Sequence, residues 1–141
     1  MKISEHFDIR EFIDPESYQA RGVKSIELID IRIVRCVELL REITGKPIII
    51  NTWHINGQYK ESGLRQMNTA TGAKYSQHKY GRAIDVKVSG MKAEDVRKLI
   101  RANWNEFKAV GLTTIEKDTP TWVHMDCRYT GLETLYEVPY K

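Results

Sequence analysis

The sequence predicts one compact domain that combines α-helices with β-strands. Its 141 residues suit a single hydrophobic core and leave little room for a second. Two segments repeat apolar residues at helical spacing, and several short runs are rich in the β-branched residues that favour strands. With 41% hydrophobic and 29% charged residues, the composition excludes collagen-like and largely disordered chains.

The N-terminal part of the chain is expected to contain an irregular segment followed by a long helix. Residues 1–24 are expected to be an irregular N-terminal segment with short helical turns and a break at Asp14-Pro15. A helix is predicted from Ser25 to Thr44, because apolar residues recur there every three or four positions. Gly45 follows this pattern as a natural C-cap.

The rest of the chain alternates strands and helices around one long connection. The β-branched run over 47–53 predicts a buried strand. Residues 54–77 show no sustained period, and because they lead into the motif described below we expect a functional loop. The remaining predicted elements are a strand over 83–88, a helix over 91–108, and strands over 112–116 and 122–127.

Hydropathy and charge narrow the cellular setting and the partners. The apolar stretches, such as Ile48–Ile50, are far shorter than the ~20 residues of a membrane helix, so no membrane span is expected. The polar N-terminus, Met1–His6, lacks the apolar core of a secretory signal, which predicts a cytoplasmic protein where it is made. The net charge of +3 comes from scattered basic residues, so no nucleic-acid partner is expected.

The two cysteines carry no metal or disulfide pattern. Cys36 and Cys127 are far apart in the sequence, which excludes a disulfide framework and an all-thiolate zinc site. We expect two buried free thiols, with Cys36 beside the apolar stripe of the first long helix and Cys127 facing away from the site described next.

The strongest functional signal is a ten-residue motif from Ser76 to Asp85, followed further along the chain by Trp122-Val123-His124. His78, Asp85 and His124 supply two imidazoles and one carboxylate, a set that suits Zn²⁺. Such a set leaves a fourth position open for water, as catalytic zinc sites do. Gly81 would allow a tight turn between the first two ligands, and the small Ala83 would leave room for the metal.

This pattern, Ser-x-His-x-x-Gly-x-Ala-x-Asp followed by Trp-x-His, resembles the zinc site of the M15 peptidases, the group of D-Ala-D-Ala carboxypeptidases and L-Ala-D-Glu endopeptidases. The hedgehog signalling domain shares that site. The helix and strand around Leu39–Pro47 also look like the element that precedes the family's first motif. The resemblance implies a small α+β fold, an antiparallel sheet with helices packed on one side, and His78, Asp85 and His124 as zinc ligands.

Phage endolysins of the group look closest, especially in Glu61–Arg65 and Tyr75–His78. The resemblance therefore implies hydrolysis of stem or cross-link peptides of bacterial peptidoglycan, by D,D-carboxypeptidase or by L,D- or D,D-endopeptidase action. A lysin without a signal would reach its substrate through a membrane-opening partner such as a holin, or as a virion component. The alternative is a zinc-containing structural or binding module without turnover, such as a phage tail component.

Peptide hydrolysis also needs a carboxylate that takes and returns a proton. Many family members place it three positions before the last His ligand, where this chain has Thr121, and this departure motivates the non-catalytic alternative. Glu116, Asp118 and Asp126 remain as candidates, and strand parity puts even-numbered residues of both strands on one face. We prefer Glu116 over Asp118, because it ends a β-rich run and a strand holds a general base more rigidly than a turn.

The roles of the neighbouring side chains are less sharply defined by the sequence. Asp126 is expected to orient a ligand imidazole, and Ser76 to act as an orienting hydrogen-bond group. Trp122 either walls the substrate cleft or packs in the core. The family's Ser-Gly-Tyr-Arg carboxylate anchor after the first strand is replaced by Asn51–His54, which leaves Arg65 and Arg82 as candidate carboxylate-binding residues.

Overall fold

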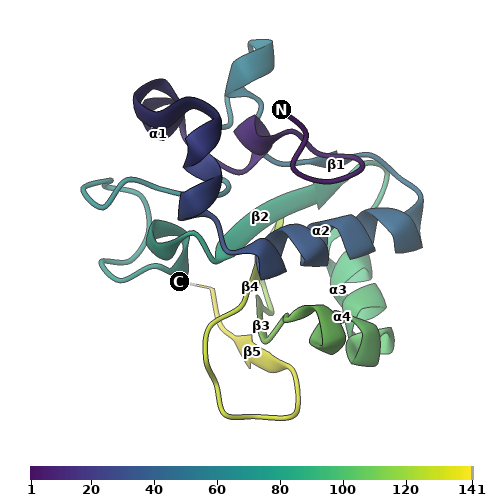
Figure 1. Ribbon diagram of the computed structural model, residues 1–141. Coiled ribbons are helices and arrows are strands. Elements are labelled where there is room, and N and C mark those ends of the chain that lie inside the picture. The colour runs from purple at the N-terminus through teal and green to yellow at the C-terminus, as the bar shows by residue number, and fades with distance from the viewer. Residues whose placement is uncertain (141) are drawn as a thin grey trace.

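The computed structural model describes residues 1–140 and contains a five-stranded sheet with the strand order β1-β2-β4-β3-β5 (Figure 1). Four of its strands are joined antiparallel, and β5 runs parallel to β3. The strands are β1 Ile48–Ile49, β2 Ala83–Val88, β3 Thr114–Glu116, β4 Val123–Asp126 and β5 Tyr136–Val138. The α+β fold class predicted from the sequence is confirmed, although the sheet is mixed.

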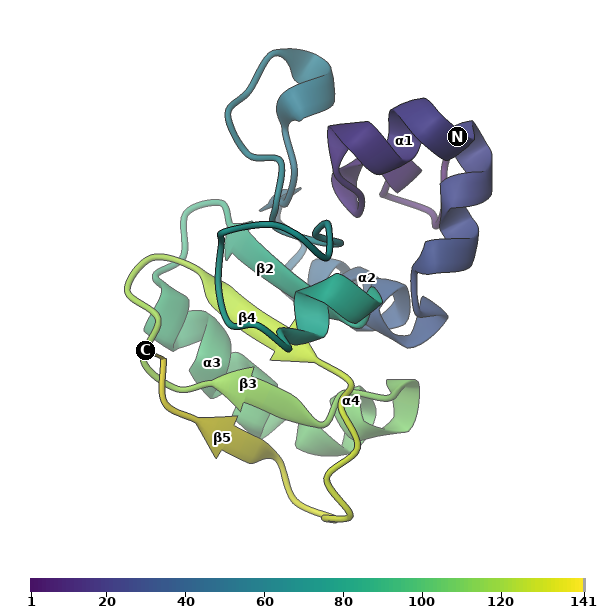
Figure 2. The same ribbon diagram turned by 90° about the vertical axis from the view of Figure 1, so that its left-hand side faces the viewer.

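Three helices cover one face of this sheet, as Figure 2 shows from the opposite face. They are α2 Ile31–Thr44, α3 Ala93–Ala102 and α4 Trp104–Val110. The shorter α1 Pro15–Arg21 packs against the 3-10 helix η2 Gly22–Leu28. Among the described residues, no helix has the length and apolar character needed to cross a membrane.

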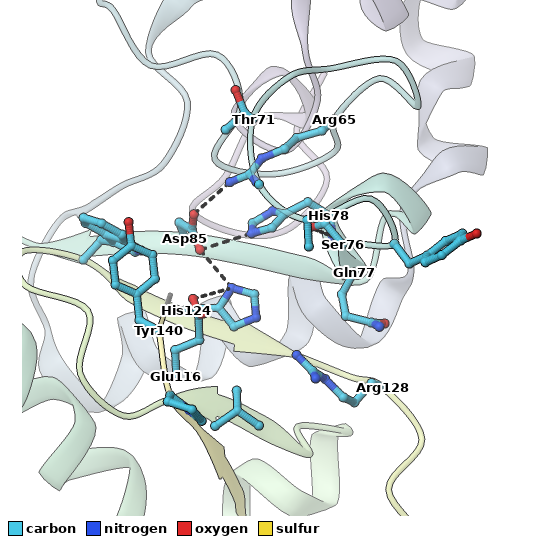
Figure 3. A pocket seen from close by; sticks show the side chains of 16 residues that line it. Arg65, Thr71, Ser76, Gln77, His78, Asp85, Glu116, His124, Arg128 and Tyr140 are labelled. Carbon is cyan, nitrogen blue, oxygen red and sulfur yellow. Dashed lines mark hydrogen bonds and ion pairs between the residues drawn. The ribbon is translucent and has the colours of Figure 1, made fainter.

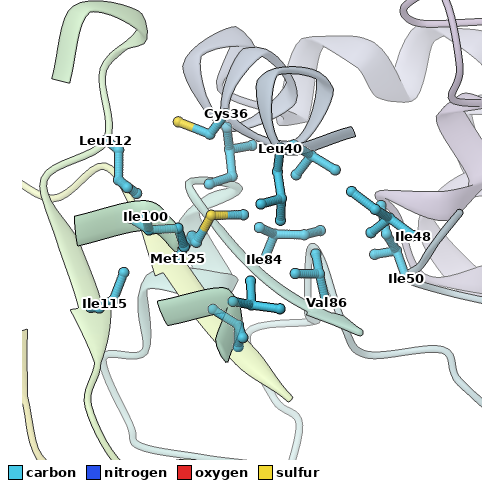
Figure 4. Close-up of a cluster of buried hydrophobic side chains, with 14 of the residues drawn as sticks. Cys36, Leu40, Ile48, Ile50, Ile84, Val86, Ile100, Leu112, Ile115 and Met125 are labelled. Carbon is cyan, nitrogen blue, oxygen red and sulfur yellow. The ribbon is translucent and has the colours of Figure 1, made fainter. Parts of the chain in front are cut away.

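The alternation of side chains along the strands separates the core from the site. Ile84 of β2 and Met125 of β4 are fully buried, and they lie in the cluster beneath the helices (Figure 4). Leu40 of α2 and Ile100 of α3 complete the centre of that cluster. Because neighbouring residues of a strand point to opposite faces, Asp85 and its cross-strand neighbours face away from the helices. The core thus fixes which face is left for chemistry.

The cysteine prediction is confirmed. Cys36 of α2 and Cys127, just after β4, are both buried free thiols in the main hydrophobic cluster. Strand alternation puts Cys127 on the face opposite His124. Neither thiol belongs to the polar face of the sheet.

Both long predicted helices are interrupted. The first begins at Ile31 instead of Ser25, because the Asp30 carboxylate accepts a hydrogen bond from Arg32 N and caps α2. Its predicted end at Gly45 is confirmed. The second predicted helix is divided at Asn103, where the side-chain amide donates to Leu99 O at 2.8 Å. An amide that bonds the preceding turn competes with helix propagation.

The strand and N-terminal predictions also need correction. The strand predicted over 47–53 is regular only at Ile48–Ile49, because the chain leaves the sheet and forms the 3-10 helix η3 Trp53–Ile55. Strand β5 was not predicted, since three residues carry too short a pattern. Residues 1–24 are more ordered than expected: they contain α1 and the 3-10 helix η1 Ile9–Glu11, and they bury several apolar side chains.

Candidate active site

The site is built on a cross-strand pair at the centre of the sheet. Asp85 of β2 lies directly opposite His124 of β4, and His124 Nδ1 is 3.0 Å from Asp85 Oδ1. The same carboxylate oxygen lies 3.2 Å from His78 Nε2 (Figure 3). The three side chains of the predicted motif therefore converge on one point, with both imidazoles buried.

His78 reaches this point from a 3-10 helix, η4 Gln77–Tyr80, that ends the long connection. Ser76 caps η4, and its hydroxyl accepts a hydrogen bond from His78 N at 3.2 Å. Gly81 then reverses the chain with a φ of +71°, and a Cβ at this position would lie 1.9 Å from Leu28 O. Only glycine fits this turn, which brings the chain from His78 into β2.

Each imidazole is oriented by a hydrogen bond on its other nitrogen. His78 Nδ1 lies 2.9 Å from Gly63 O, which can only accept, so this nitrogen carries the proton and Nε2 is free to bind a metal. His124 Nε2 lies 2.6 Å from Asp126 Oδ2, which leaves Nδ1 facing Asp85. Arg128 in turn holds Asp126, with Nε 2.9 Å from Oδ1 and Nη2 2.6 Å from Oδ2.

The donor set fits a zinc ion. One ligand atom from each of His78, Asp85 and His124 lies within 4.8 Å of the other two. Two oriented imidazoles and one carboxylate, each backed by a second hydrogen-bond partner, match the ligand types and outer contacts of catalytic zinc centres. Asp85 Oδ2 receives such a contact from Arg65 Nη2 at 3.2 Å.

Burial and the neighbouring charges shift the pKa values of the three ligands, downward for His78 and Asp85 and upward for His124. Burial lowers the pKa of His78. Burial also opposes protonation of His124, but its hydrogen bonds with Asp126 and Asp85 outweigh this effect and raise the pKa of His124 to about 9. For Asp85, burial raises the pKa, and the two imidazoles overcome it and hold the pKa well below its usual range. The three groups thus behave as one coupled electrostatic unit.

Glu116 is a further carboxylate beside the ligand set, next to the Nδ1 side of His124. It ends β3, its side chain is 21% exposed, and Oε1 lies 3.5 Å from His124 Nδ1. Burial raises the pKa of Glu116, with a smaller opposing effect from His124. The other acidic candidate, Asp118, is exposed and accepts a hydrogen bond from Tyr140 N at 2.6 Å. The structure therefore brings Glu116 to the site and leaves Asp118 outside it.

The three ligand residues and Glu116 lie in a cleft with a volume of about 730 Å³. One wall is the connection around Tyr75, and the other includes Tyr140, whose ring meets Trp122 edge-on with 5.1 Å between ring centroids. Trp122 therefore lines the cleft instead of packing in the core. Two arginines, Arg65 and Arg128, also line it (Figure 3).

The two candidate carboxylate-binding arginines are placed differently. Arg65 lines the cleft beside Asp85, whereas Arg82 lies outside it, with Nε donating to Gln77 Oε1 and its guanidinium 5.1 Å from the ring centroid of Tyr80. Arg128 was missed by the sequence reasoning. Arg128 lies two residues after Asp126, and residues at this spacing in an extended chain share one face of the sheet. This spacing could have identified Arg128 from the sequence.

Asn51–His54 do not match the Ser-Gly-Tyr-Arg pattern, but Ser-Gly-Leu-Arg, which differs from it at one position, occurs further along at Ser62–Arg65. Residues 52–61 form an excursion that leaves and rejoins the sheet edge: Ser62 N donates to Asn51 Oδ1 at 2.9 Å, and Asp85 N donates to Ser62 O at 2.7 Å. A Cβ on Gly63 would lie 2.2 Å from Phe12 O, so glycine is required there. The excursion places Ser62–Arg65 beside Asp85 of β2, so that Arg65 reaches the cleft.

A His-Asp-His set with the Glu116 carboxylate beside it in an open cleft is the arrangement of a metal-dependent hydrolase site. A model of the Peptidase M15 family matches residues 5–126, and the chain therefore belongs to the M15 metallopeptidases. No curated protein and no solved structure matches the chain. The family implies zinc-dependent peptidase activity, in agreement with the donor set.

Proposed function

We propose that this protein hydrolyses peptide bonds in the stem or cross-link peptides of bacterial peptidoglycan. The observation that carries the proposal is the convergence of His78, Asp85 and His124 with Glu116 in one open cleft. M15 membership supports peptidase chemistry. The cell-wall substrate rests on the similarity of Glu61–Arg65 and Tyr75–His78 to phage endolysins of the group.

In this proposal His78 Nε2, Asp85 and His124 Nδ1 would hold the zinc ion. When bound, zinc supplies a Lewis acid that lowers the pKa of water and polarises the scissile carbonyl. Asp126 keeps the His124 ring in the required orientation, and Gly63 O does the same for His78. The protein thus presents ligand atoms that do not have to be reoriented before binding.

Glu116 is the proton carrier of the reaction. Its carboxylate takes the proton of the attacking water and returns it to the leaving amine. Burial, which raises the pKa of Glu116, brings it closer to the range where it both accepts and releases a proton near neutral pH. Its place at the end of a paired strand keeps it beside His124 Nδ1, the ring nitrogen that would bind the metal.

Arg65 and Arg128 give the cleft two guanidinium groups for an anionic peptide. Each already contacts a carboxylate of the site, Asp85 or Asp126, and each retains further N–H donors. Stem peptides carry free carboxylates, which guanidinium binds with paired hydrogen bonds. The similarity to phage proteins also supports a phage origin, with action at the wall after release from the host cell or within a virion.

The experiment is a hydrolysis assay on purified peptidoglycan. The protein is stripped with a chelator, divided, and restored with zinc in one half, and new amino groups and peptide products are then measured. We expect amino groups to be released only by the zinc-restored half, and mass spectrometry of the products identifies the bond. Full zinc binding without release of amino groups would favour a non-catalytic zinc module, such as a phage tail component.

A further inference from the structure

A second, smaller pocket of about 220 Å³ adjoins the metal site. It shares Asp85 and Trp122 with the main cleft and extends toward β1, where Ile49 lines it. A peptide that crosses the metal site in an extended form therefore reaches this pocket with a neighbouring residue. The pocket contains a cation that the chemistry described above does not use.

This cation is Lys87, which lies two residues after Asp85 on β2 and so on the same face of the sheet. The two Cα atoms of such a pair are about 7 Å apart, the length of one dipeptide unit. Lys87 Nζ donates to the hydroxyl of Tyr59 at 2.9 Å and lies 4.9 Å from the centroid of its ring. Backbone hydrogen bonds from Thr52 and Trp53 to Tyr59 O hold this tyrosine in place.

Within residues 1–140, no acidic side chain neutralises the charge of Lys87. Among residues 1–140 no carboxylate forms an ion pair with it, and its side-chain partner is the neutral phenol of Tyr59. Asp85, the carboxylate in the same pocket, is engaged by Arg65 and both imidazoles. An ammonium group has three donors, so two remain for a ligand.

We propose that this pocket is a specificity subsite for a carboxylate-bearing residue of the peptide substrate, with Lys87 as the group that binds the carboxylate. The inference rests on the proposed peptidase function. Ile49 and Trp122 supply apolar surface for the aliphatic part of that residue, and Tyr59 fixes the direction of the ammonium group. Its small volume suits one short side chain or a chain end, not a second peptide strand.

The test uses the zinc-loaded protein and a stem peptide whose free carboxyl groups are converted to carboxamides one at a time. In the natural chain, one conversion should raise KM roughly tenfold, as expected for a lost charge-assisted hydrogen bond, while kcat stays within about twofold. In Lys87→Met, the peptide with the free acid and the peptide with that amide should have the same KM. Lys87→Arg should keep the preference for the acid. The proposal would be overturned if, for every carboxyl group, the ratio of the KM of the amide to the KM of the acid were the same in the natural chain and in Lys87→Met.

A binding measurement separates this inference from the proposed function. If no stem peptide is cleaved, the proposed function fails, and the subsite is tested by titrating the isotopically labelled zinc protein with N-acetylalanine or N-acetylalaninamide. The acid should shift the NMR signals of Ile49 and Lys87 saturably, and the amide should not. The affinity for N-acetylalanine should fall at least about fivefold in Lys87→Met. This variant retains the apolar stem of the side chain and loses the ammonium group. Equal shifts with acid and amide would refute the subsite.

Discussion

Asp85 and His124 face each other across the two central strands of the sheet, with His124 Nδ1 3.0 Å from Asp85 Oδ1. Two of the three proposed ligands are thus held by the most extensively paired part of the fold. His78 comes from the adjoining η4 turn, which depends on Gly81. This arrangement predicts different consequences for changes in the ligands, in their hydrogen-bond partners and in the turn.

Removal of any one ligand should abolish stable zinc binding. His78→Ala, Asp85→Ala and His124→Ala each leave two protein ligands, too few for a stable site. Elemental analysis should give about one zinc per chain for the natural protein and almost none for the variants. His6→Ala is the control, because His6 pairs with Glu38 away from the site. Full zinc content in all three ligand variants would refute the assignment.

Asp126→Asn should weaken zinc binding without unfolding the protein. The amide has nearly the shape of the carboxylate but lacks the charge that orients His124 and raises its basicity, so zinc affinity should fall roughly 10- to 100-fold. Competition with a chromophoric chelator measures this change. Arg128→Gln keeps the contact between Asp126 and His124 and should lose much less. An equal loss in both variants would mean that the ion pair, not the imidazole contact, controls affinity.

Zinc affinity should increase with pH across the neutral range. Because the pKa of His124 is raised to about 9 without the metal, its ring carries a proton below that pH, and zinc has to displace it. His78, whose pKa is lowered, is already neutral there. The apparent association constant should therefore increase about tenfold per pH unit and level off near the pKa of His124. A pH-independent affinity between neutrality and that pKa would contradict this charge assignment.

Gly81→Ala should destabilise the fold far more than Gly45→Ala. Both glycines have positive φ angles, but a Cβ on Gly81 would meet Leu28 O at 1.9 Å, whereas nothing lies within 4 Å of one on Gly45. The backbone conformation alone costs about 1 kcal/mol, and the clash should bring the loss at Gly81 above about 3 kcal/mol. Urea denaturation of the two variants checks this, and equal losses would show that the turn is not tightly packed.

The sequence predicted the regular core because its patterns were long and periodic. The strand Ala83–Val88 was predicted with its observed bounds, and the helix that ends at Thr44 was predicted with the correct C-cap. The errors fall where one polar side chain decides the outcome. Because Asp30 caps α2, this helix begins later than the apolar pattern predicts. Asn103 divides the second predicted helix. Such local competition leaves the apolar pattern unchanged, so periodicity does not reveal it.

Within the site, motif spacing was informative and long-range contacts were not. The sequence identified the candidate ligands His78, Asp85 and His124, because both the residue types and their spacing can be recognised without a structure. The parity argument also placed Glu116 on the face of His124. By contrast, Arg128 and the excursion that displaces Arg65 depend on where separate segments meet. Tyr140 lines the cleft through β5, a strand too short to predict.

The most direct test of the account compares the hydrolytic rate of Glu116→Gln with that of Asp118→Asn, each at full zinc occupancy. Glu116→Gln should retain zinc and fold while kcat falls roughly 10²- to 10⁴-fold, the usual contribution of a positioned proton carrier. Asp118→Asn should lose far less, because the Asp118 carboxylate is exposed and accepts a hydrogen bond from the backbone N–H of Tyr140. A normal rate in Glu116→Gln, or the larger loss in Asp118→Asn, would contradict the central claim that Glu116 carries the proton.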